Sequence, residues 1–192
     1  MFQTAFPLFL LRELPFSRFD FPRWQSLLAI SLIGLLIGLD PSLRAAPPDM
    51  PAPPLWLAVI MGLLTTWVAF LIIVAVLRWW MKRGGRWDGQ GDLLNLVAAS
   101  WLMADTVGAG LVALGVPSLF TLPLWLYSAW VGVNALAGAI PKASFGYSIG
   151  GIVVSFIPAM LAAMVVFAVL GIVLTMLGVV PPPTGAGPKG VG

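Results

Sequence analysis

Asp105 is the residue with the clearest potential for chemistry, because it is the only acidic side chain inside a long apolar stretch of the chain. A carboxylate inside a bilayer costs a few kcal/mol even on insertion scales, so it must be neutral, paired or in contact with water. The functional interpretation is an ion or proton site. The structural alternatives are a carboxylic acid that hydrogen-bonds within a helix bundle and one that lies near the outer interface. No second acid, histidine or basic residue accompanies Asp105 inside the apolar stretches, which counts against a proton relay.

A second group of functional candidates occupies residues 78–92, "RWWMKRGGRWDGQGD", where basic residues are interleaved with tryptophans. Basic side chains at a membrane surface attract anionic lipid headgroups by about 1 kcal/mol each, and tryptophan favours headgroup depth. The candidate lipid contacts are Arg78, Lys82, Arg83, Arg86, Trp79 and Trp80. The alternative is that these charges only set the orientation of the chain in the membrane, without lipid specificity. The glycines predict a turn, after which Asp92 is placed to cap a helix.

Several classes of chemistry are excluded by residues that the sequence lacks. There is no cysteine and no histidine, which removes disulfides, thiolate catalysis, Cys-ligated metal centres and the commonest general base. No Gly-Lys-Ser/Thr triplet occurs, so a phosphate-binding loop is not predicted. We therefore expect a protein that is not an enzyme and that has no cofactor and no metal. The net charge of +3 is carried by short loops, so we expect no nucleic-acid partner either.

The elements that must position these residues are membrane helices. The 192 residues are 60% hydrophobic and 9% charged, with a mean hydropathy of +1.01, which indicates an integral membrane protein. The apolar stretches predict a polytopic, all-α bundle of five transmembrane helices, near residues 24–39, 55–77, 93–114, 119–140 and 148–177. Together they make up a membrane domain over residues 24–180, with an interfacial N-terminal segment over 1–23 and a flexible tail over 181–192.

The first and the last predicted helices depart from the usual length. Residues 24–39 span about 24 Å as a helix, which is short for a hydrocarbon core of about 30 Å. A cleaved signal peptide is the rival interpretation of this stretch, with "LRAAP" as a crude processing site. Residues 148–177 would span about 45 Å, so this helix is tilted, kinked at Pro158 or longer than the bilayer is thick.

Basic residues predict the orientation of the helices. With a cytoplasmic N-terminus, the cytoplasmic segments collect eight basic residues and the outer segments two, as the positive-inside rule requires. The eight are Arg12, Arg18, Arg23, Arg78, Lys82, Arg83, Arg86 and Lys142, and the two are Arg44 and Lys189. Five helices then leave the C-terminus outside. Omitting the first helix would place the N-terminal charges on the wrong side, so this count independently favours five.

Small residues at helix-packing intervals predict close contact between helices, because lipid gives no hydrophobic drive for helix association. The candidate packing glycines are Gly34, Gly38, Gly108, Gly132, Gly146 and Gly150. They indicate a compact bundle within one chain or a homodimer through "GLLIG" or "GYSIG". Asn95 and Asn134 are predicted to form hydrogen bonds between helices. Between the last two helices, Pro141 ends one helix and Ser144 can cap the next.

The second half of the chain resembles a known family, through "RGGRWDGQGDLLNLVAASWLMADTVGAGLVAL" and "LWLYSAWVGVNALAGAIPKASFGYSIGGIVVSFIPAMLAAMVVFAVLG". The shared features are a Gly-rich turn before a "DLLNLVAAS" helix, a Trp- and Tyr-bearing fourth helix, a short turn of small residues, and a proline in the fifth helix. In these features the chain resembles the bacterial branch of the Ypt-interacting protein (Yip) family over roughly residues 80–172. The resemblance implies five membrane helices, a cytoplasmic N-terminus and a multi-pass place in the bacterial inner membrane. Eukaryotic members bind Rab-type GTPases, but this chain lacks their long cytosolic N-terminal region, so only the architecture carries over.

Two functional hypotheses follow. The leading one is a non-enzymatic integral membrane protein of the Yip type, a membrane-organising or accessory scaffold that acts through helix packing and its basic cytoplasmic face. The alternative is a small transporter or channel in which Asp105 is the ion or proton site. The expected partners are the lipid bilayer and either other membrane proteins or further copies of the chain.

Overall fold

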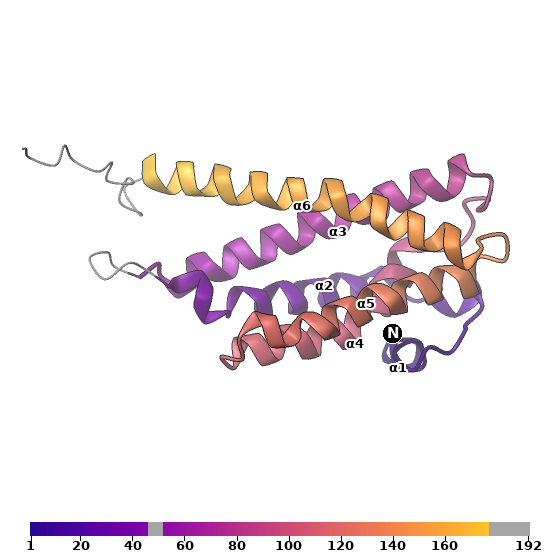
Figure 1. Cartoon of the computed structure of the whole chain (residues 1–192), viewed down its shortest axis with the longest axis horizontal. Helices are drawn as coiled ribbons and strands as arrows, with labels where there is room; N and C mark the ends of the chain where they lie inside the picture. The colour runs from indigo at the N-terminus through magenta and orange to yellow at the C-terminus, as the bar shows by residue number, and fades with distance from the viewer. Residues whose placement is uncertain (46–51, 177–192) are drawn as a thin grey trace, which may run out of the picture.

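The chain folds almost entirely into helices. The computed structural model describes residues 1–45 and 52–176, and these two ranges contain no strand (Figure 1). Its elements, with η for a 3₁₀ helix, are α1 (Phe2–Phe9), η1 (Phe16–Phe19), α2 (Arg23–Gly38), η2 (Pro41–Arg44), α3 (Leu55–Arg83), α4 (Leu93–Ala113), α5 (Ser118–Ala139) and α6 (Phe145–Met176). The tail predicted over 181–192, and Lys189 within it, lies outside the described residues.

Within residues 1–45 and 52–176, four helices, α3 to α6, are long enough and apolar enough to cross a membrane. The chain is therefore an all-helical, multi-pass membrane protein, as the sequence predicts. Helix α2, the first predicted span, is apolar but has only 16 residues. Helix α3 continues past its predicted end at Leu77 to Arg83, so the basic residues that follow Leu77 are helical too.

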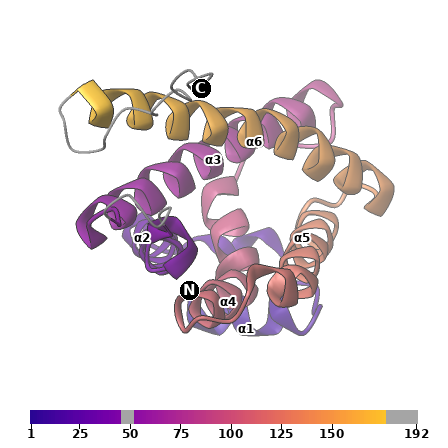
Figure 2. The same ribbon diagram turned by 60° about the vertical axis from the view of Figure 1, so that its left-hand side comes forward.

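The five longest helices form a closed ring. Helix α2 packs against α3, α3 against α6, α6 against α5, α5 against α4, and α4 back against α2, whereas α3 and α4 have little contact across the middle. Figure 2, in which the helices are foreshortened, shows this ring. Consecutive helices run in opposite directions, so the N-terminal segment, the α3–α4 turn and the α5–α6 turn lie at the same end (Figure 1). We call this the basic end, because every described basic residue except Arg44 lies in these segments or in the last six residues of α3.

Polar caps and prolines fix the helix ends. Helix α4 begins after Asp92, whose Oδ1 accepts hydrogen bonds from the backbone N–H groups of Leu94 at 3.1 Å and Asn95 at 3.3 Å. Helix α6 begins after Ser144, whose Oγ accepts one from the N–H of Tyr147 at 3.3 Å. Both caps are the ones that the sequence predicts.

The N-terminal segment packs on the outside of the ring. Helix α1 lies across the direction of the long helices and against α4 (Figure 1), with Ala5 and Leu8 buried. The N-terminal amino group donates a hydrogen bond to Gln25 Oε1 at 2.8 Å, and the Tyr127 hydroxyl donates one to the carbonyl of Phe9. Residues 1–23 are thus a packed part of the bundle, and their position at a membrane interface stays a prediction.

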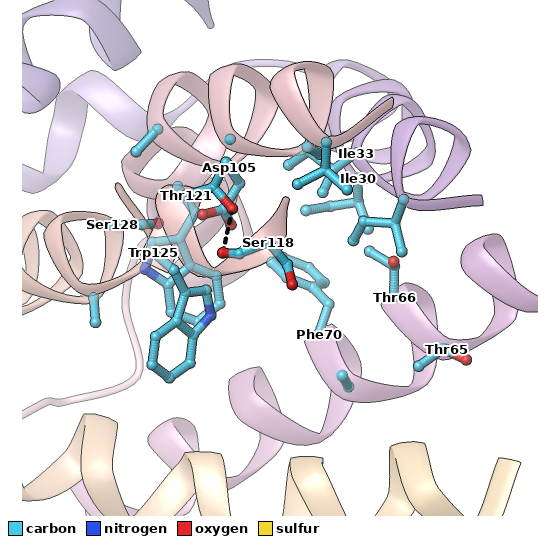
Figure 3. Close-up of a pocket in the computed structure, with 18 of the residues that line it drawn as sticks. Ile30, Ile33, Thr65, Thr66, Phe70, Asp105, Ser118, Thr121, Trp125 and Ser128 are labelled. Carbon is cyan, nitrogen blue, oxygen red and sulfur yellow. Dashed lines mark hydrogen bonds between the residues drawn. The ribbon is translucent and has the colours of Figure 1, made fainter. Parts of the chain in front are cut away.

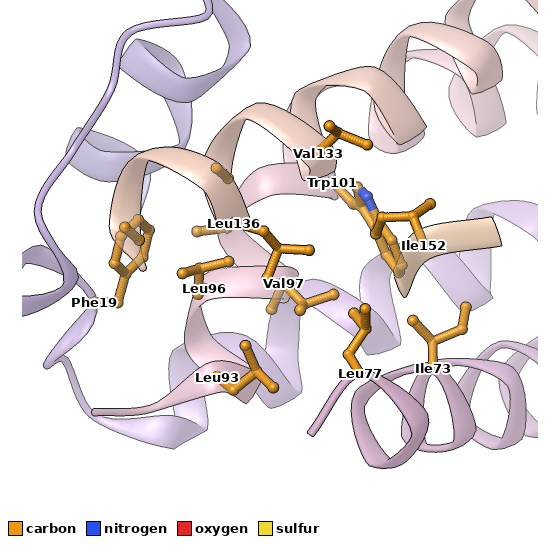
Figure 4. Packing of buried hydrophobic residues seen from close by; sticks show 14 of the residues in the cluster. Phe19, Ile73, Leu77, Leu93, Leu96, Val97, Trp101, Val133, Leu136 and Ile152 are labelled. Carbon is orange, nitrogen blue, oxygen red and sulfur yellow. The ribbon is translucent and has the colours of Figure 1, made fainter. Parts of the chain in front are cut away.

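Buried apolar side chains fill the half of the ring nearer the basic end. Phe19, Leu77, Met81, Leu96 and Leu136 have no exposed surface. They belong to one cluster that surrounds the first half of α4 (Figure 4). This half of the ring is therefore solid, and it closes the interior from the basic end.

Asn95 joins α4 to α2 and to the N-terminal segment. Its side chain is only 1% exposed. Ser26 Oγ donates a hydrogen bond to Asn95 Oδ1 at 2.7 Å, and Asn95 Nδ2 donates to the carbonyls of Phe19 at 2.9 Å and Phe21 at 2.7 Å. The predicted interhelical role of Asn95 is confirmed.

The same prediction for Asn134 is wrong. Asn134 Nδ2 donates to the carbonyl of Trp130 at 2.9 Å, one turn earlier in the same helix. Asn134 is partly exposed, so the local backbone carbonyl satisfies its amide and no second helix is needed.

Glycines bring the backbones of α2 and α3 into contact where the two helices cross. A Cβ atom added at Gly38 would lie 2.5 Å from Val59 Cα and 2.8 Å from Ala58 O, and one added at Gly62 would lie 2.6 Å from Gly34 O. Real Cβ atoms essentially never lie so close to another atom. The packing predicted for Gly34 and Gly38 therefore occurs within one chain, against Gly62, which the sequence did not single out.

The other predicted packing glycines differ from one another. A Cβ atom added at Gly132 would lie 2.6 Å from the indole nitrogen of Trp101, and one at Gly150 would lie 3.3 Å from a tryptophan ring at the end of α3. Both glycines thus make room for an indole of a neighbouring helix. A Cβ atom at Gly108 would have one contact, at 3.9 Å, and one at Gly146 would have none within 4 Å. Within one chain, the structure gives Gly146 no packing role and Gly108 only an ordinary contact.

Candidate functional site

A cavity of about 380 Å³ lies inside the ring, toward the end opposite the basic end. All five ring helices contribute to its wall. Figure 3 labels lining residues of α2, α3, α4 and α5. Ile73 and Trp101 line its deepest level, next to the buried cluster, and Asp40 and Ser118 line it at the end of the bundle. On α4 the wall runs from Trp101 to Val112, about 16 Å at 1.5 Å per residue, roughly half the thickness of a hydrocarbon core.

Asp105 faces this cavity from the middle of α4 (Figure 3). Ser128, on α5, lines the same cavity (Figure 3). The described residues contain one ion pair, Arg23 with Asp92, so Asp105 has no Lys or Arg partner among them. The charged residues that line the cavity are both acids, Asp40 and Asp105. The cavity is therefore suited to a positive charge and unsuited to a negative one.

Hydroxyl groups add polar contacts to the wall. The hydroxyls of Thr65 and Thr66 on α3 are buried and have no hydrogen-bond partner in the described part of the chain. The Thr121 hydroxyl donates to the Ser118 carbonyl at 2.9 Å (Figure 3) and keeps its acceptor capacity.

Four aromatic rings from four helices form a continuous part of the wall. Phe70 of α3 meets Trp101 of α4 edge to face, with ring centroids 6.4 Å apart. Trp101 contacts Phe156 of α6 at 5.9 Å, and Phe156 meets Trp125 of α5 edge to face at 5.4 Å. Trp101 precedes Asp105 by one helical turn, so the indole and the carboxyl group lie on the same side of α4.

The predicted basic lipid contacts lie at the other end of the bundle. Each positive group there lies over an aromatic ring: Arg78 over Trp87 at 5.8 Å, Lys82 over Trp87 at 5.7 Å, Arg83 over Trp79 at 5.2 Å and Arg86 over Tyr147 at 5.3 Å. None of the four forms an ion pair within residues 1–45 and 52–176. These cations are therefore held in place by aromatic rings while their charge stays available to anionic groups outside the chain.

The two tryptophans among the predicted lipid contacts differ in their surroundings. Trp79 is 50% exposed, as a headgroup contact would require. Trp80 joins α3 to α6: its Nε1 donates to the Tyr147 carbonyl at 3.2 Å, and the Tyr147 hydroxyl donates to the Trp80 carbonyl at 2.7 Å. Trp80 is thus a packing residue, and spacing along the chain could not reveal a partner 67 residues away.

A second hollow, of about 760 Å³, lies at the basic end between the N-terminal segment and the two turns. Its wall contains three acidic residues, Asp20, Asp88 and Asp92, and three basic residues, Arg23, Arg86 and Lys142. Arg23 Nε lies 2.6 Å from Asp92 Oδ2, and this hydrogen bond, together with the opposite charge, raises the pKa of Arg23. Because its charges cancel, this hollow is not expected to select an anion.

The sequence identified Asp105 but not the residues around it. Trp101, Asp105, Gly108 and Val112 line the cavity from α4, and Ser118, Thr121, Trp125 and Ser128 line it from α5. Both sets recur every three or four residues, which is the signature of one helix face. The cavity wall on α4 and α5 could therefore have been predicted from this spacing of polar and aromatic residues on two successive apolar helices.

Comparison with known proteins adds no assignment: no family model, no curated protein and no solved structure matches the chain. The resemblance to the Yip family therefore stays a prediction from the residues quoted above.

Proposed function

We propose that this protein binds a small cation at Asp105 and moves it across the membrane, which is the transporter or channel alternative raised by the sequence. One observation carries the proposal. In the described part of the chain, the intramembrane carboxyl group of Asp105 has no basic partner and faces a cavity whose charged wall residues are both acids. An acidic residue inside a membrane helix is rare because its burial is costly, and such residues commonly mark ion or substrate pathways.

The proposal includes five crossings in the bacterial inner membrane, with α2 as the first and the basic end in the cytoplasm. Two features support it. Helix α2 packs alongside two of the longer helices and alternates in direction with α3, and all described basic residues but Arg44 lie at one end. The cavity then opens away from the cytoplasm, and the buried cluster closes it on the cytoplasmic side. Passage of a cation requires this cluster to open, as in alternating access.

Cation flux into liposomes tests the proposal. Purified protein is reconstituted, and the entry of H⁺, Na⁺, K⁺ and benzyltrimethylammonium is followed after a gradient of each is imposed. We expect flux of at least one of these cations, and Asp105→Asn should reduce it to the level of empty liposomes. Asp20→Asn is the matched control, because it removes the same charge at an exposed position outside the cavity. No flux of any of the four, or flux unchanged by Asp105→Asn, would reject the proposal.

A second candidate function is the Yip-type scaffold that binds anionic lipid or other membrane proteins through its basic face. The observation in its favour is a group of cations at and just after the end of α3 that form no ion pair within the described residues: Arg78, Lys82, Arg83 and Arg86. Neutralising the first three with glutamine should remove co-purifying anionic lipid or protein in mild detergent, whereas Arg12→Gln should not. Retention of the same partners by the triple variant would reject this function.

A further inference from the structure

The wall of the Asp105 cavity is mostly apolar and aromatic, which narrows the kind of cation that it fits. Metal ions are held by several oxygen ligands at once. In the described part of the chain, no group of three or more acidic side chains comes together to hold a metal ion. The polar groups of the wall are one central carboxyl, a second at the mouth and a few hydroxyls, set among Phe70, Trp101, Trp125 and Phe156.

We propose that the cavity binds a lipophilic organic ammonium ion, with its positive charge against Asp105 and its apolar part against the aromatic rings. This inference rests on the proposed cation function and adds the chemical class of the cation. Aromatic faces attract organic cations through their quadrupole, and tryptophan does so best, so two of the four rings are of the most favourable type. A weakly hydrated ammonium ion also loses less hydration than a metal ion on leaving water.

The placement of the groups fits one such ion. Asp105 follows Trp101 by one helical turn on α4, so the carboxyl group lies beside the chain of rings. The volume of about 380 Å³ lies at the small end of the range of roughly 300–1,000 Å³ for ligand pockets. A bare metal ion or a proton would leave most of this space and the aromatic wall without a role.

Thermal unfolding of the protein in mild detergent provides the test. The probe is benzyltrimethylammonium, compared with neopentylbenzene, its uncharged isostere in which carbon replaces nitrogen, and with Na⁺. We expect the ammonium ion to raise the unfolding temperature in a saturable way, the isostere to do so much less, and Na⁺ not at all. In Asp105→Asn the advantage of the ammonium ion over its isostere should disappear.

A matched pair of tryptophans separates the aromatic contribution from general packing. Trp125 and Trp130 both lie on α5 and are 47% and 46% exposed, but only Trp125 lines the cavity. Trp125→Leu should weaken ammonium binding roughly 2- to 30-fold, the worth of one cation–π contact, and Trp130→Leu should leave it unchanged. Trp125→Phe, which keeps a ring, should restore most of the affinity and covers the case in which the leucine variant folds poorly.

Equal effects of the isostere and the ammonium ion, or ammonium binding that is indifferent to Asp105 and Trp125, would overturn the inference. The inference would also be overturned if Asp105-dependent flux or stabilisation occurred only with Na⁺, K⁺ or H⁺. The proposed cation function would then still stand. If Asp105→Asn changes neither the flux nor the unfolding temperature with any of the cations, the inference and the proposed function are both overturned.

Discussion

Replacing Gly62 by alanine should loosen the contact between α2 and α3. An added Cβ atom would lie 2.6 Å from Gly34 O, whereas ordinary van der Waals contacts of Cβ atoms begin at 3.4 Å. The clash is with backbone atoms of α2, which cannot rotate away as a side chain could. The added atom would lie closer still to the backbone nitrogen of Gly38, so the two helices must separate locally by at least about 0.8 Å.

The expected cost follows from overpacking. Inserting a methyl group into a closely packed interior destabilises by about 1–3 kcal/mol, and the higher helix propensity of alanine returns at most about 1 kcal/mol. Gly110→Ala is the control, because nothing lies within 4 Å of a Cβ atom added at this position in α4. The control should be neutral or more stable than the parent by up to about 1 kcal/mol.

Unfolding by SDS in mixed micelles, followed by far-ultraviolet circular dichroism, measures both variants against the parent protein. Gly62→Ala should unfold at a lower SDS fraction, and Gly110→Ala at the same or a higher one. If Gly62→Ala is as stable as Gly110→Ala, the backbone contact of α2 with α3 does not exist as described.

The same titration tests two polar contacts. Asn95→Ala leaves three hydrogen-bonding groups without their partner, and two of these hydrogen bonds are buried. It should cost about 1–3 kcal/mol, whereas Asn134→Ala should stay within about 0.5 kcal/mol of the parent. Equal effects would contradict the role given to Asn95. Asp92→Ala removes both a helix cap worth about 1 kcal/mol and the ion pair with Arg23, whereas Arg23→Ala removes the ion pair alone. Asp92→Ala should therefore destabilise the protein more than Arg23→Ala. The reverse order would show that the cap is unimportant.

The helices could be predicted from the sequence because apolar length is a local property. The differences from prediction lie at the ends. Helix α3 continues to Arg83, since nothing between Leu77 and Arg83 breaks a helix even though the apolar run stops there. Helix α6 begins at Phe145, before its predicted start at Ser148, because the Ser144 cap sets its first turn.

Asp105 could be found from the sequence because an acidic residue within a long apolar stretch is a local feature of the sequence. The residues around Asp105 could not be predicted, because tertiary packing decides which faces of α3, α5 and α6 turn toward α4. The two asparagines illustrate the limit: Asn95 and Asn134 both lie in apolar helices, and only the folding of the N-terminal segment onto α4 gives Asn95 its partners. Pairwise contacts such as Gly38 with Gly62 depend on the same packing.

The central claim is that Asp105 sits in a cavity that is open to one side of the membrane and attracts cations. The chain has no cysteine, so cysteines can be introduced one at a time into an unmodified background. Ala109 lines the cavity one helical turn from Asp105 toward its mouth, and Ala98, on the same helix, is fully buried. The decisive measurement is the rate at which Ala109→Cys reacts with cationic and anionic methanethiosulfonate reagents added to one side of sealed membrane vesicles. We expect Ala109→Cys to react only from the side opposite the basic end, and faster with the cationic reagent. Asp105→Asn should abolish this preference, and Ala98→Cys should be unreactive throughout. Equal rates for the two reagents, reaction from the basic side, or no reaction at Ala109→Cys would contradict the central claim.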